Sequence, residues 1–213
     1  MYDYGTSGST NVFVWKSTGN GLSSNSSWHT WSAGNYNAID CIKSRFVAGD
    51  FNGDGKCDVA SMYQYSSGQV NWFVQTSTGN AFNGNSTWRM WSAGNYNADK
   101  VNGRISVGKI NNDAKDDIAV FYDAGGDSGK FLVYAPNTAG TGFNDRVLHL
   151  WPQNSYSAGL ITNRMTVGRF SGGNYGSIAA NYRYSNMGKV WMYRVKASTH
   201  ATGIEENGYT AWW

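Results

Sequence analysis

The chain has 213 residues, of which only 15% are charged, and its formal net charge is +3. Because this weak positive charge forms no run of Lys or Arg, we expect no nucleic-acid partner. No apolar stretch approaches the roughly 18 residues of a membrane span, so we expect no membrane insertion. Aromatic residues make up 15%, and 27 glycines stand beside only 2 prolines. This composition favours short strands joined by turns, and therefore an all-β fold.

A repeat of about 60 residues organises the chain. The segment Thr30–Ala38 (TWSAGNYNA) returns as MWSAGNYNA at Met90–Ala98, and in weaker form as LWPQNSYSA at Leu150–Ala158. The tryptophan in each copy follows the previous one by 60 residues, at Trp31, Trp91 and Trp151. An internal period of this length is typical of proteins built from repeated supersecondary units.

The chain begins with part of such a unit. Met1–Tyr4 aligns with Met62–Tyr65, in the second strand of a unit, and is followed by a predicted third strand at Asn11–Lys16 and a fourth at Ser27–Trp31. The later units read as complete. In the unit with the clearest pattern, the four predicted strands are Arg104–Ile110, Asp117–Tyr122, Lys130–Ala135 and Arg146–Trp151.

Four short antiparallel strands in about 60 residues predict β-propeller blades, within a single repeat domain over 1–213. We expect a partial blade over 1–38 and three full blades at about 39–98, 99–158 and 159–213. Because an open sheet edge invites pairing, such an array must close. A four-bladed ring is one solution, and two chains forming a ring of seven or eight blades is another. We favour the second, which predicts self-association as a dimer.

The segment GDFNGDGKCD (49–58) concentrates acidic side chains in one Gly-rich loop between two predicted strands. Oxygen atoms converging from alternate positions of a tight turn are the ligands that Ca²⁺ prefers. The candidate ligands are the side chains of Asp50, Asn52, Asp54 and Asp58 and the backbone carbonyl of Lys56. We therefore predict a structural calcium site with no catalytic role, or alternatively an Asp/Asn/Gly turn without metal.

This loop, GDFNGDGKCDVA, resembles the calcium loop of FG-GAP/VCBS repeats, which build the propellers of integrin α-chains and of many secreted proteins. The resemblance implies a calcium-bearing propeller and, with the low charge, a secreted protein. The later units depart from the motif. Lys109 stands at the position of Asp50, and we expect its ammonium group to pair with Asp113 or Asp117. The next unit has Arg169, Ser171, Gly173 and Ser177, so we expect no metal there.

The sequence shows no catalytic arrangement, since its three histidines have no neighbouring Ser/Asp pair and no metal-ligand spacing. We therefore expect recognition rather than catalysis. An aromatic ring beside planar polar side chains suits a sugar. The carbohydrate-binding candidates recur in each unit: Trp28, Trp31, Asn35, Tyr36 and Arg45; Trp88, Trp91, Asn95, Tyr96 and Arg104; Trp151, Asn154 and Tyr156. Packing between adjacent blades is the competing explanation for the recurring tryptophans.

The arrangement is similar to that of seven-bladed mushroom lectins with calcium loops, which bind N-acetylglucosamine-type sugars between blades. This likeness implies a lectin-like protein whose partners are glycans, although it transfers no ligand residue. A protein-binding or adhesion propeller, as in integrins, is the alternative, and an excised or designed fragment that self-assembles is a third.

Overall fold

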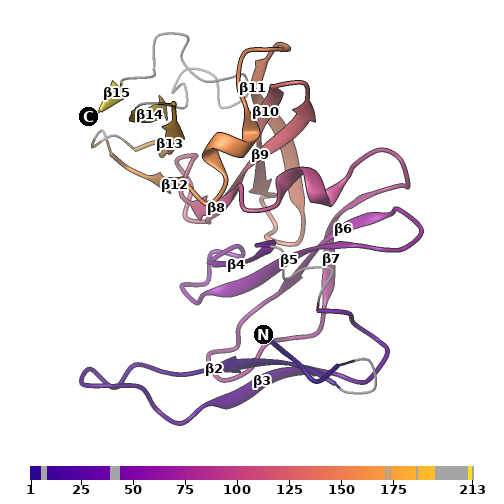
Figure 1. Cartoon of the computed structure of the whole chain (residues 1–213). Coiled ribbons are helices and arrows are strands. Elements are labelled where there is room, and N and C mark those ends of the chain that lie inside the picture. The colour runs from indigo at the N-terminus through magenta and orange to yellow at the C-terminus, as the bar shows by residue number, and fades with distance from the viewer. Residues whose placement is uncertain are drawn as a thin grey trace.

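The computed structural model describes residues 1–5, 9–38, 44–170, 172, 174–185, 187–194 and 211–212. Over these residues the protein is an all-β fold of four antiparallel sheets, one with three strands and three with four (Figure 1). Within each sheet the strands follow one another in chain order, so every connection inside a sheet joins neighbouring strands. The predicted all-β class and the incomplete first unit are therefore confirmed.

The strands have the following bounds. The first sheet contains β1 (Tyr2–Asp3), β2 (Thr10–Val14) and β3 (Ser26–Trp31). The second contains β4 (Phe46–Gly49), β5 (Asp58–Gln64), β6 (Val70–Gln75) and β7 (Ser86–Trp91). The third contains β8 (Ile105–Gly108), β9 (Asp117–Gly125), β10 (Ser128–Pro136) and β11 (Phe143–Trp151). The fourth contains β12 (Met165–Gly168), β13 (Ser177–Arg183), β14 (Gly188–Arg194) and β15 (Ala211–Trp212).

The predicted strands of the third sheet lie where expected, but β8 is shorter than predicted and the other three are longer, with β11 beginning at Phe143 instead of Arg146. Strand β9 continues to Gly125, and β10 starts at Ser128, which pairs with Gly125. The two residues between them, Gly126 and Asp127, both have positive φ angles of 59° and 51°. Two such residues form a tight turn whose twist matches that of the flanking strands, so pairing extends to the end of the hairpin.

The second strands of the second and third sheets are buried on both faces, because each of these two sheets lies between two neighbouring sheets. In β9, Ile118 and Val120 belong to the apolar cluster shared with the second sheet. The alternate residues Ala119 and Phe121 belong to the cluster shared with the fourth sheet. The two-residue period of a strand thus divides β9 between two cores. A third cluster joins the first and second sheets.

Successive sheets meet through their first strands. Strand β4 lies beside β8, and β8 beside β12. Close approach is possible because each of these strands ends in glycine. A Cβ atom on Gly49 would lie 2.7 Å from Val107 Cγ1, and one on Gly108 would lie 2.9 Å from Val167 Cγ1. The same glycine–valine contact therefore recurs at two consecutive junctions.

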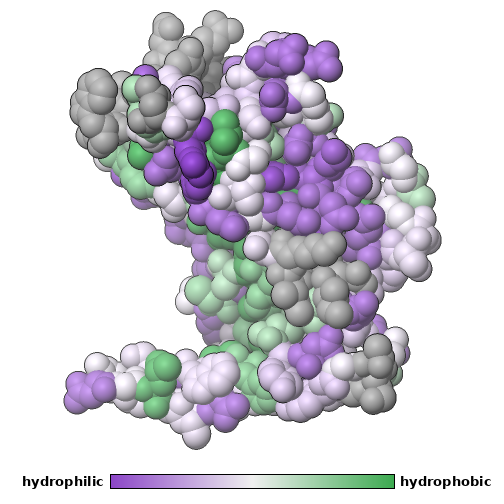
Figure 2. Space-filling view, viewed as in Figure 1, coloured by the Kyte–Doolittle hydropathy of each residue, from purple (hydrophilic) through white to green (hydrophobic). Residues whose placement is uncertain are grey.

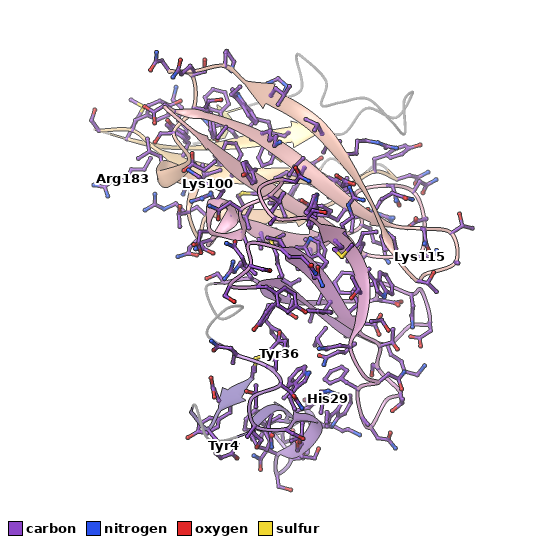
Figure 3. The ribbon with its side chains drawn as sticks, turned by 90° about the vertical axis from the view of Figure 1, so that its right-hand side faces the viewer. Tyr4, His29, Tyr36, Lys100, Lys115 and Arg183 are labelled. Carbon is purple, nitrogen blue, oxygen red and sulfur yellow. The ribbon has the colours of Figure 1, made fainter. Side chains whose placement is uncertain are left out.

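Linkers carry the chain from one sheet to the next. Two of them contain short 3₁₀ helices, η1 (Ala98–Val101) and η2 (Ala158–Ile161). Neither is long and apolar enough to cross a membrane, and the described part of the chain has no other helix. In Figure 3, Lys100 of η1 and Lys115 of the β8–β9 loop lie on opposite sides of the molecule, so the η1 linker and the β8–β9 loop occupy opposite ends of the third sheet.

Candidate functional site

The recurring tryptophans stack on the tyrosines that follow them. Trp31 stacks on Tyr36 with ring centroids 4.3 Å apart, and Trp91 stacks on Tyr96 at 4.4 Å. The third pair, Trp151 and Tyr156, stacks at 4.8 Å. Each tyrosine lies in a linker and contacts the next sheet, so these pairs fasten consecutive sheets together.

Hydrogen bonds between tyrosine hydroxyl groups also connect consecutive sheets at two of these stacks. Tyr134 in β10 donates to the hydroxyl oxygen of Tyr96 over 3.0 Å, and Tyr193 in β14 donates to that of Tyr156 over 3.0 Å. Burial raises the pKa of Tyr96 and Tyr156 above the ordinary tyrosine value. Neither Tyr134 nor Tyr193 was predicted from the sequence, although both occupy the same position of the repeat, opposite Ile118 and Ile178 of the neighbouring strands.

The side chain two residues before each tryptophan also contacts its ring. His29 lies edge-on to Trp31 at 4.5 Å, and His149 lies edge-on to Trp151 at 4.3 Å. In the second sheet, the guanidinium group of Arg89 lies 5.2 Å from the ring centroid of Trp91. The rings are thus occupied by protein neighbours, which supports packing as their role. Sugar binding by these residues stays a prediction.

The other predicted sugar ligands also hold linkers and turns. Arg104 donates to the carbonyl of Lys100 (2.8 Å) and to Thr162 Oγ1 in the following linker (2.9 Å). Arg45 is only 2% exposed and lies 3.9 Å from an Asp99 carboxylate oxygen. The exposed residues Asn35 and Asn95 donate their backbone N–H groups to the carbonyls of Ser32 and Ser92 in two equivalent turns.

Trp28 and Trp88 pack against a phenylalanine of the following sheet. Trp28 contacts Phe82, and Trp88 contacts Phe143, each with ring centroids 5.0 Å apart. In the third sheet this position is Leu148, which is buried but smaller than tryptophan. The residue aligned with Phe143 in the last unit falls outside the described residues.

The aspartate loop lies between β4 and β5 and is organised by its own backbone. Asp50 accepts hydrogen bonds from the N–H groups of Gly53, Asp54 and Gly55, at 2.8–3.0 Å. Asn52 accepts from Asp54 N–H, and Lys56 forms an ion pair with Asp54 of 3.0 Å. Gly53 and Gly55 both have positive φ angles, which lets the loop curl around the carboxylate.

Asp58 is fully buried, and both of its carboxylate oxygens face backbone donors. One oxygen accepts from Phe51 N–H (3.1 Å) and Asn52 N–H (3.3 Å), and the other accepts from Ser77 N–H (2.8 Å). Burial raises its pKa, although these hydrogen bonds oppose the shift. Asp58 therefore ties the loop to the β6–β7 hairpin.

The loop supplies the right kind of ligand for Ca²⁺, since Asp50, Asn52 and Asp54 offer oxygen atoms within one turn. Within the described residues, no three His, Cys, Asp or Glu side chains gather closely enough to hold a metal by themselves. A cation would therefore also need the amide of Asn52 and the backbone carbonyl of Lys56. These are donors that the sequence analysis named.

The equivalent loop of the third sheet is built around Lys109. Its ammonium group lies 3.5 Å from Asp116 and also donates to the carbonyl of Ala114. The predicted pairing with Asp113 or Asp117 is therefore wrong in its partner. Asp117 is instead fully buried and accepts from the backbone N–H groups of Ile110 and Asn111. Asp116 also accepts from Asp50 N–H over 2.8 Å and so links the second and third sheets. In the last unit, Ser171 and Gly173 lie outside the described residues.

A pocket of about 450 Å³ opens between the third and fourth sheets. Its apolar wall includes Ile110, Val133 and Leu148, and Tyr175 adds an aromatic ring. Its polar lining consists of planar groups, namely Asn111, Asn112, Asp113, Asp117, Asn144, Asp145 and Arg146. None of the predicted carbohydrate-binding residues lines it. The signal in the sequence was Leu148, which replaces the tryptophan found at this position in the two preceding units.

One of the residues that line this pocket, Asp117, carries a carboxyl group with a raised pKa. Asp117 is fully buried. One oxygen accepts from the N–H groups of Ile110 (2.9 Å) and Asn111 (3.0 Å), while the other accepts only from the Asn111 side-chain amide at 3.3 Å. Burial raises the pKa of Asp117 to about 7, and the nearby charges of Asp113 and Asp116 add to the shift.

No protein-family model matches this chain, and no curated protein matches its sequence.

Proposed function

We propose that this protein is a non-enzymatic, carbohydrate-binding β-propeller and that the pocket between the third and fourth sheets is a sugar site. The observation that carries the proposal is the lining of that pocket. A cavity of about 450 Å³ with an apolar wall, an aromatic ring and several planar amide, carboxyl and guanidinium groups suits a polyhydroxylated ligand.

The location of the pocket agrees with this proposal. It lies at a junction between sheets, where the repeat brings the β8–β9 loop, the β10–β11 hairpin and Tyr175 together. The equivalent space at the preceding junction is occupied by Phe51, Trp88 and Phe143, whose rings contact one another at 5.0–5.8 Å. At the pocket, Ile110 and Leu148 stand at the positions of Phe51 and Trp88, so two aromatic rings are replaced by smaller side chains.

The test is a glycan array followed by titration of the best sugars into three proteins. We expect the parent chain to bind at millimolar ligand or better. Leu148→Trp restores the side chain of the earlier units inside the pocket and should abolish binding. Leu150→Trp is the matched control, because Leu150 is 64% exposed and does not line the pocket, and it should bind like the parent. Absence of sugar binding by the parent chain would refute the proposal.

The arrangement of the sheets supports a propeller. Each sheet is a four-stranded antiparallel meander or part of one, consecutive sheets pack face to face, and β4, β8 and β12 lie side by side. These are the features expected of blades arranged around a common axis, with the first strands innermost. Figure 2 shows a concave side with apolar surface between the first sheet and the rest of the molecule.

Self-association would cover the face that the first sheet leaves open. Tyr63 and Tyr182 pack on linker tyrosines of the preceding unit, at 5.2 and 4.6 Å. Their equivalent in the first sheet, Tyr2, is 57% exposed, and Tyr4 is 53% exposed. Figure 3 places Tyr4 at the end of the molecule farthest from Arg183. A second copy of the chain supplies the same kind of aromatic surface, so the proposed partner is another chain of this protein.

Light scattering tests this assembly. We expect a dimer that Tyr2→Ser together with Tyr4→Ser weakens toward the monomer. Leu22→Ser serves as the control, since Leu22 is 70% exposed on the β2–β3 hairpin away from those tyrosines. A parent chain that stays monomeric at high concentration would contradict the proposal.

Calcium is the proposed structural ion of the 49–58 loop, held by the oxygens of Asp50, Asn52 and Asp54 together with Asp58 and the carbonyl of Lys56. Affinities of extracellular modules are about 10⁻⁴–10⁻³ M. At roughly 10 mM Ca²⁺ such a site would add about 1–3 kcal/mol of stability. Thermal melts with Ca²⁺, with Mg²⁺ and with chelator measure the effect, and Asp54→Asn should remove it. Equal melting temperatures in Ca²⁺ and chelator would exclude the site.

A further inference from the structure

Two asparagines occupy the same position of the repeat and share one sequence pattern. The segments 25–27 (NSS) and 85–87 (NST) each consist of Asn, a residue other than Pro, and Ser or Thr, which is the acceptor pattern for N-linked glycans. In both units the asparagine precedes the recurring tryptophan, Trp31 or Trp91, by six residues. No other asparagine in the sequence has Ser or Thr two positions later.

The structure exposes both segments. Asn25 comes directly before β3 and Asn85 directly before β7, each in irregular backbone outside the strand, and both residues are exposed. The hydroxyl residues Ser27 and Thr87 lie near the starts of the same strands and are exposed as well. An enzyme can therefore reach the asparagine and the hydroxyl group of each segment from solvent.

The side-chain amides of Asn25 and Asn85 are not engaged elsewhere. Within the described part of the chain neither makes a hydrogen bond, whereas the amide of Asn83, close by in the sequence, donates to Thr76 Oγ1 over 2.8 Å. Neither Asn25 nor Asn85 belongs to the apolar clusters between the sheets or lines the pocket. A bulky group attached at these two positions would therefore leave the packing of the junctions unchanged.

Both asparagines stand at the start of an edge strand. Among the described strands, β3 and β7 are the outermost strands of their sheets, and Met90 of β7 is 54% exposed. An edge strand presents unpaired backbone groups and invites pairing with another chain unless charge or bulk prevents it. A glycan is bulky and well hydrated, so one attached beside the edge would hinder such pairing.

The third sheet protects the same place by charge. Its residue at the repeat position of Asn25 and Asn85 is Asp145, which lies within β11 and is followed by the exposed Arg146. Asp145 forms an ion pair with Arg89 of the second sheet, with an N–O distance of 2.7 Å. Charged side chains thus occur in the third unit where the first two have acceptor asparagines.

We propose that Asn25 and Asn85 are acceptors of N-linked glycans and that these glycans shield the outer edges of the first and second sheets. The donor is a lipid-linked oligosaccharide pyrophosphate, used by an oligosaccharyltransferase on the secretory route that the sequence analysis expects. The new bond joins the asparagine Nδ2 to the anomeric carbon of the first sugar. The bond from that carbon to the pyrophosphate breaks, the lipid pyrophosphate leaves, and the amide nitrogen gives up one proton. This modification is independent of the proposed sugar site.

The experiment secretes the full chain from a eukaryotic host behind a cleavable signal and measures its intact mass before and after treatment with a peptide N-glycosidase. We expect one glycan at each of the two asparagines. Release by the glycosidase converts each glycosylated asparagine to aspartate, so peptide mapping identifies the positions. Unmodified asparagine at both positions of the secreted chain would overturn the proposal, whether or not the chain binds sugars.

Variants separate the acceptor pattern from other effects of substitution. Thr87→Ala breaks the pattern and should remove the glycan at Asn85. Ser86→Ala is the matched control, because it removes the neighbouring exposed hydroxyl group but keeps the pattern, and it should retain that glycan. Ser27→Ala should remove the glycan at Asn25. A glycan retained in Thr87→Ala, or lost in Ser86→Ala, would contradict the assignment.

The shielding role has its own readout. Light scattering compares the glycosylated parent with the double variant Ser27→Ala, Thr87→Ala, both held at one temperature below their unfolding transitions. We expect species larger than the proposed dimer to form several-fold faster in the variant, because its outer edges are uncovered. Equal rates would overturn the shielding role, and parent protein stripped by the glycosidase should behave like the variant.

Discussion

The junction between the second and third sheets and the junction between the third and fourth sheets share one framework but differ in how they are filled. At the first of these junctions, Phe51, Trp88 and Phe143 occupy the space beside the strand-connecting loops. At the second, Ile110 and Leu148 stand at the positions of Phe51 and Trp88 and line a pocket. At the linker end of both junctions, the Trp–Tyr stack is the same.

The two junctions indicate that one end of a repeat can hold the sheets together while the other end remains available for binding. The linker end of each junction holds the sheets together through aromatic stacking and hydroxyl hydrogen bonds. The loop end is then free to vary, because losing an aromatic ring there leaves the stack intact. Where Ile110 and Leu148 replace the aromatic rings of Phe51 and Trp88, the junction has a pocket, while the strand order of the sheets on either side is the same.

The largest expected loss of unfolding free energy comes from removing an aromatic ring from the packed junction between the second and third sheets. Trp88→Ala removes a buried ring that contacts Phe143, and the cost for such a truncation is about 3–5 kcal/mol of unfolding free energy. Leu148→Ala should cost less, since its side chain already borders a cavity. Urea unfolding followed by circular dichroism compares the two variants. Equal losses would show that the two junctions are packed alike.

A second test compares the two buried carboxyls through pH. The pKa of Asp117 is raised to about 7 in the folded protein, against about 3.9 in an unfolded chain. The folded state therefore binds more protons between these values, so Asp117 makes stability fall as pH rises from about 4 to about 7, with no further change above. Each pKa unit corresponds to about 1.4 kcal/mol.

The measurement is the unfolding free energy of the parent chain and of Asp117→Asn at pH 5, 6, 7 and 8. Other groups contribute equally to both proteins, so the difference between the two curves isolates Asp117. We expect the unfolding free energy of Asp117→Asn to lack the part of the decline below pH 7 that Asp117 causes in the parent chain. Parallel curves over the whole range would show that Asp117 titrates as an ordinary carboxyl group.

The smallest expected loss of unfolding free energy comes from removing a tyrosine hydroxyl group, and it should be equal at the two junctions. Tyr96→Phe and Tyr156→Phe each remove a hydroxyl that accepts one buried hydrogen bond, from Tyr134 and Tyr193 respectively. The expected cost is about 1 kcal/mol for each variant, because the stacked ring is retained. Chemical denaturation of the two single variants measures this. A cost in only one of them would show that the linker ends of the junctions are not equivalent.

The repeat, the all-β class, the number of units and the incomplete first unit could all be predicted from the amino-acid sequence. These follow from local information: Trp31, Trp91 and Trp151 recur at one interval, and alternating apolar residues with Gly/Asn/Asp turns specify short strands. The aspartate loop was also found this way, because its acidic residues are neighbours in the chain.

The contacts of the repeated side chains could not be predicted, because they depend on how the units pack in three dimensions. Trp91 could equally have presented its ring to a ligand, and its stacking on Tyr96 depends on how the linker folds back toward the next sheet. The pocket could not be predicted from the sequence for the same reason. Its walls come from loops and strands far apart in the chain, from Ile110 to Tyr175, and a cavity depends on the volume left between packed elements, which no local pattern encodes.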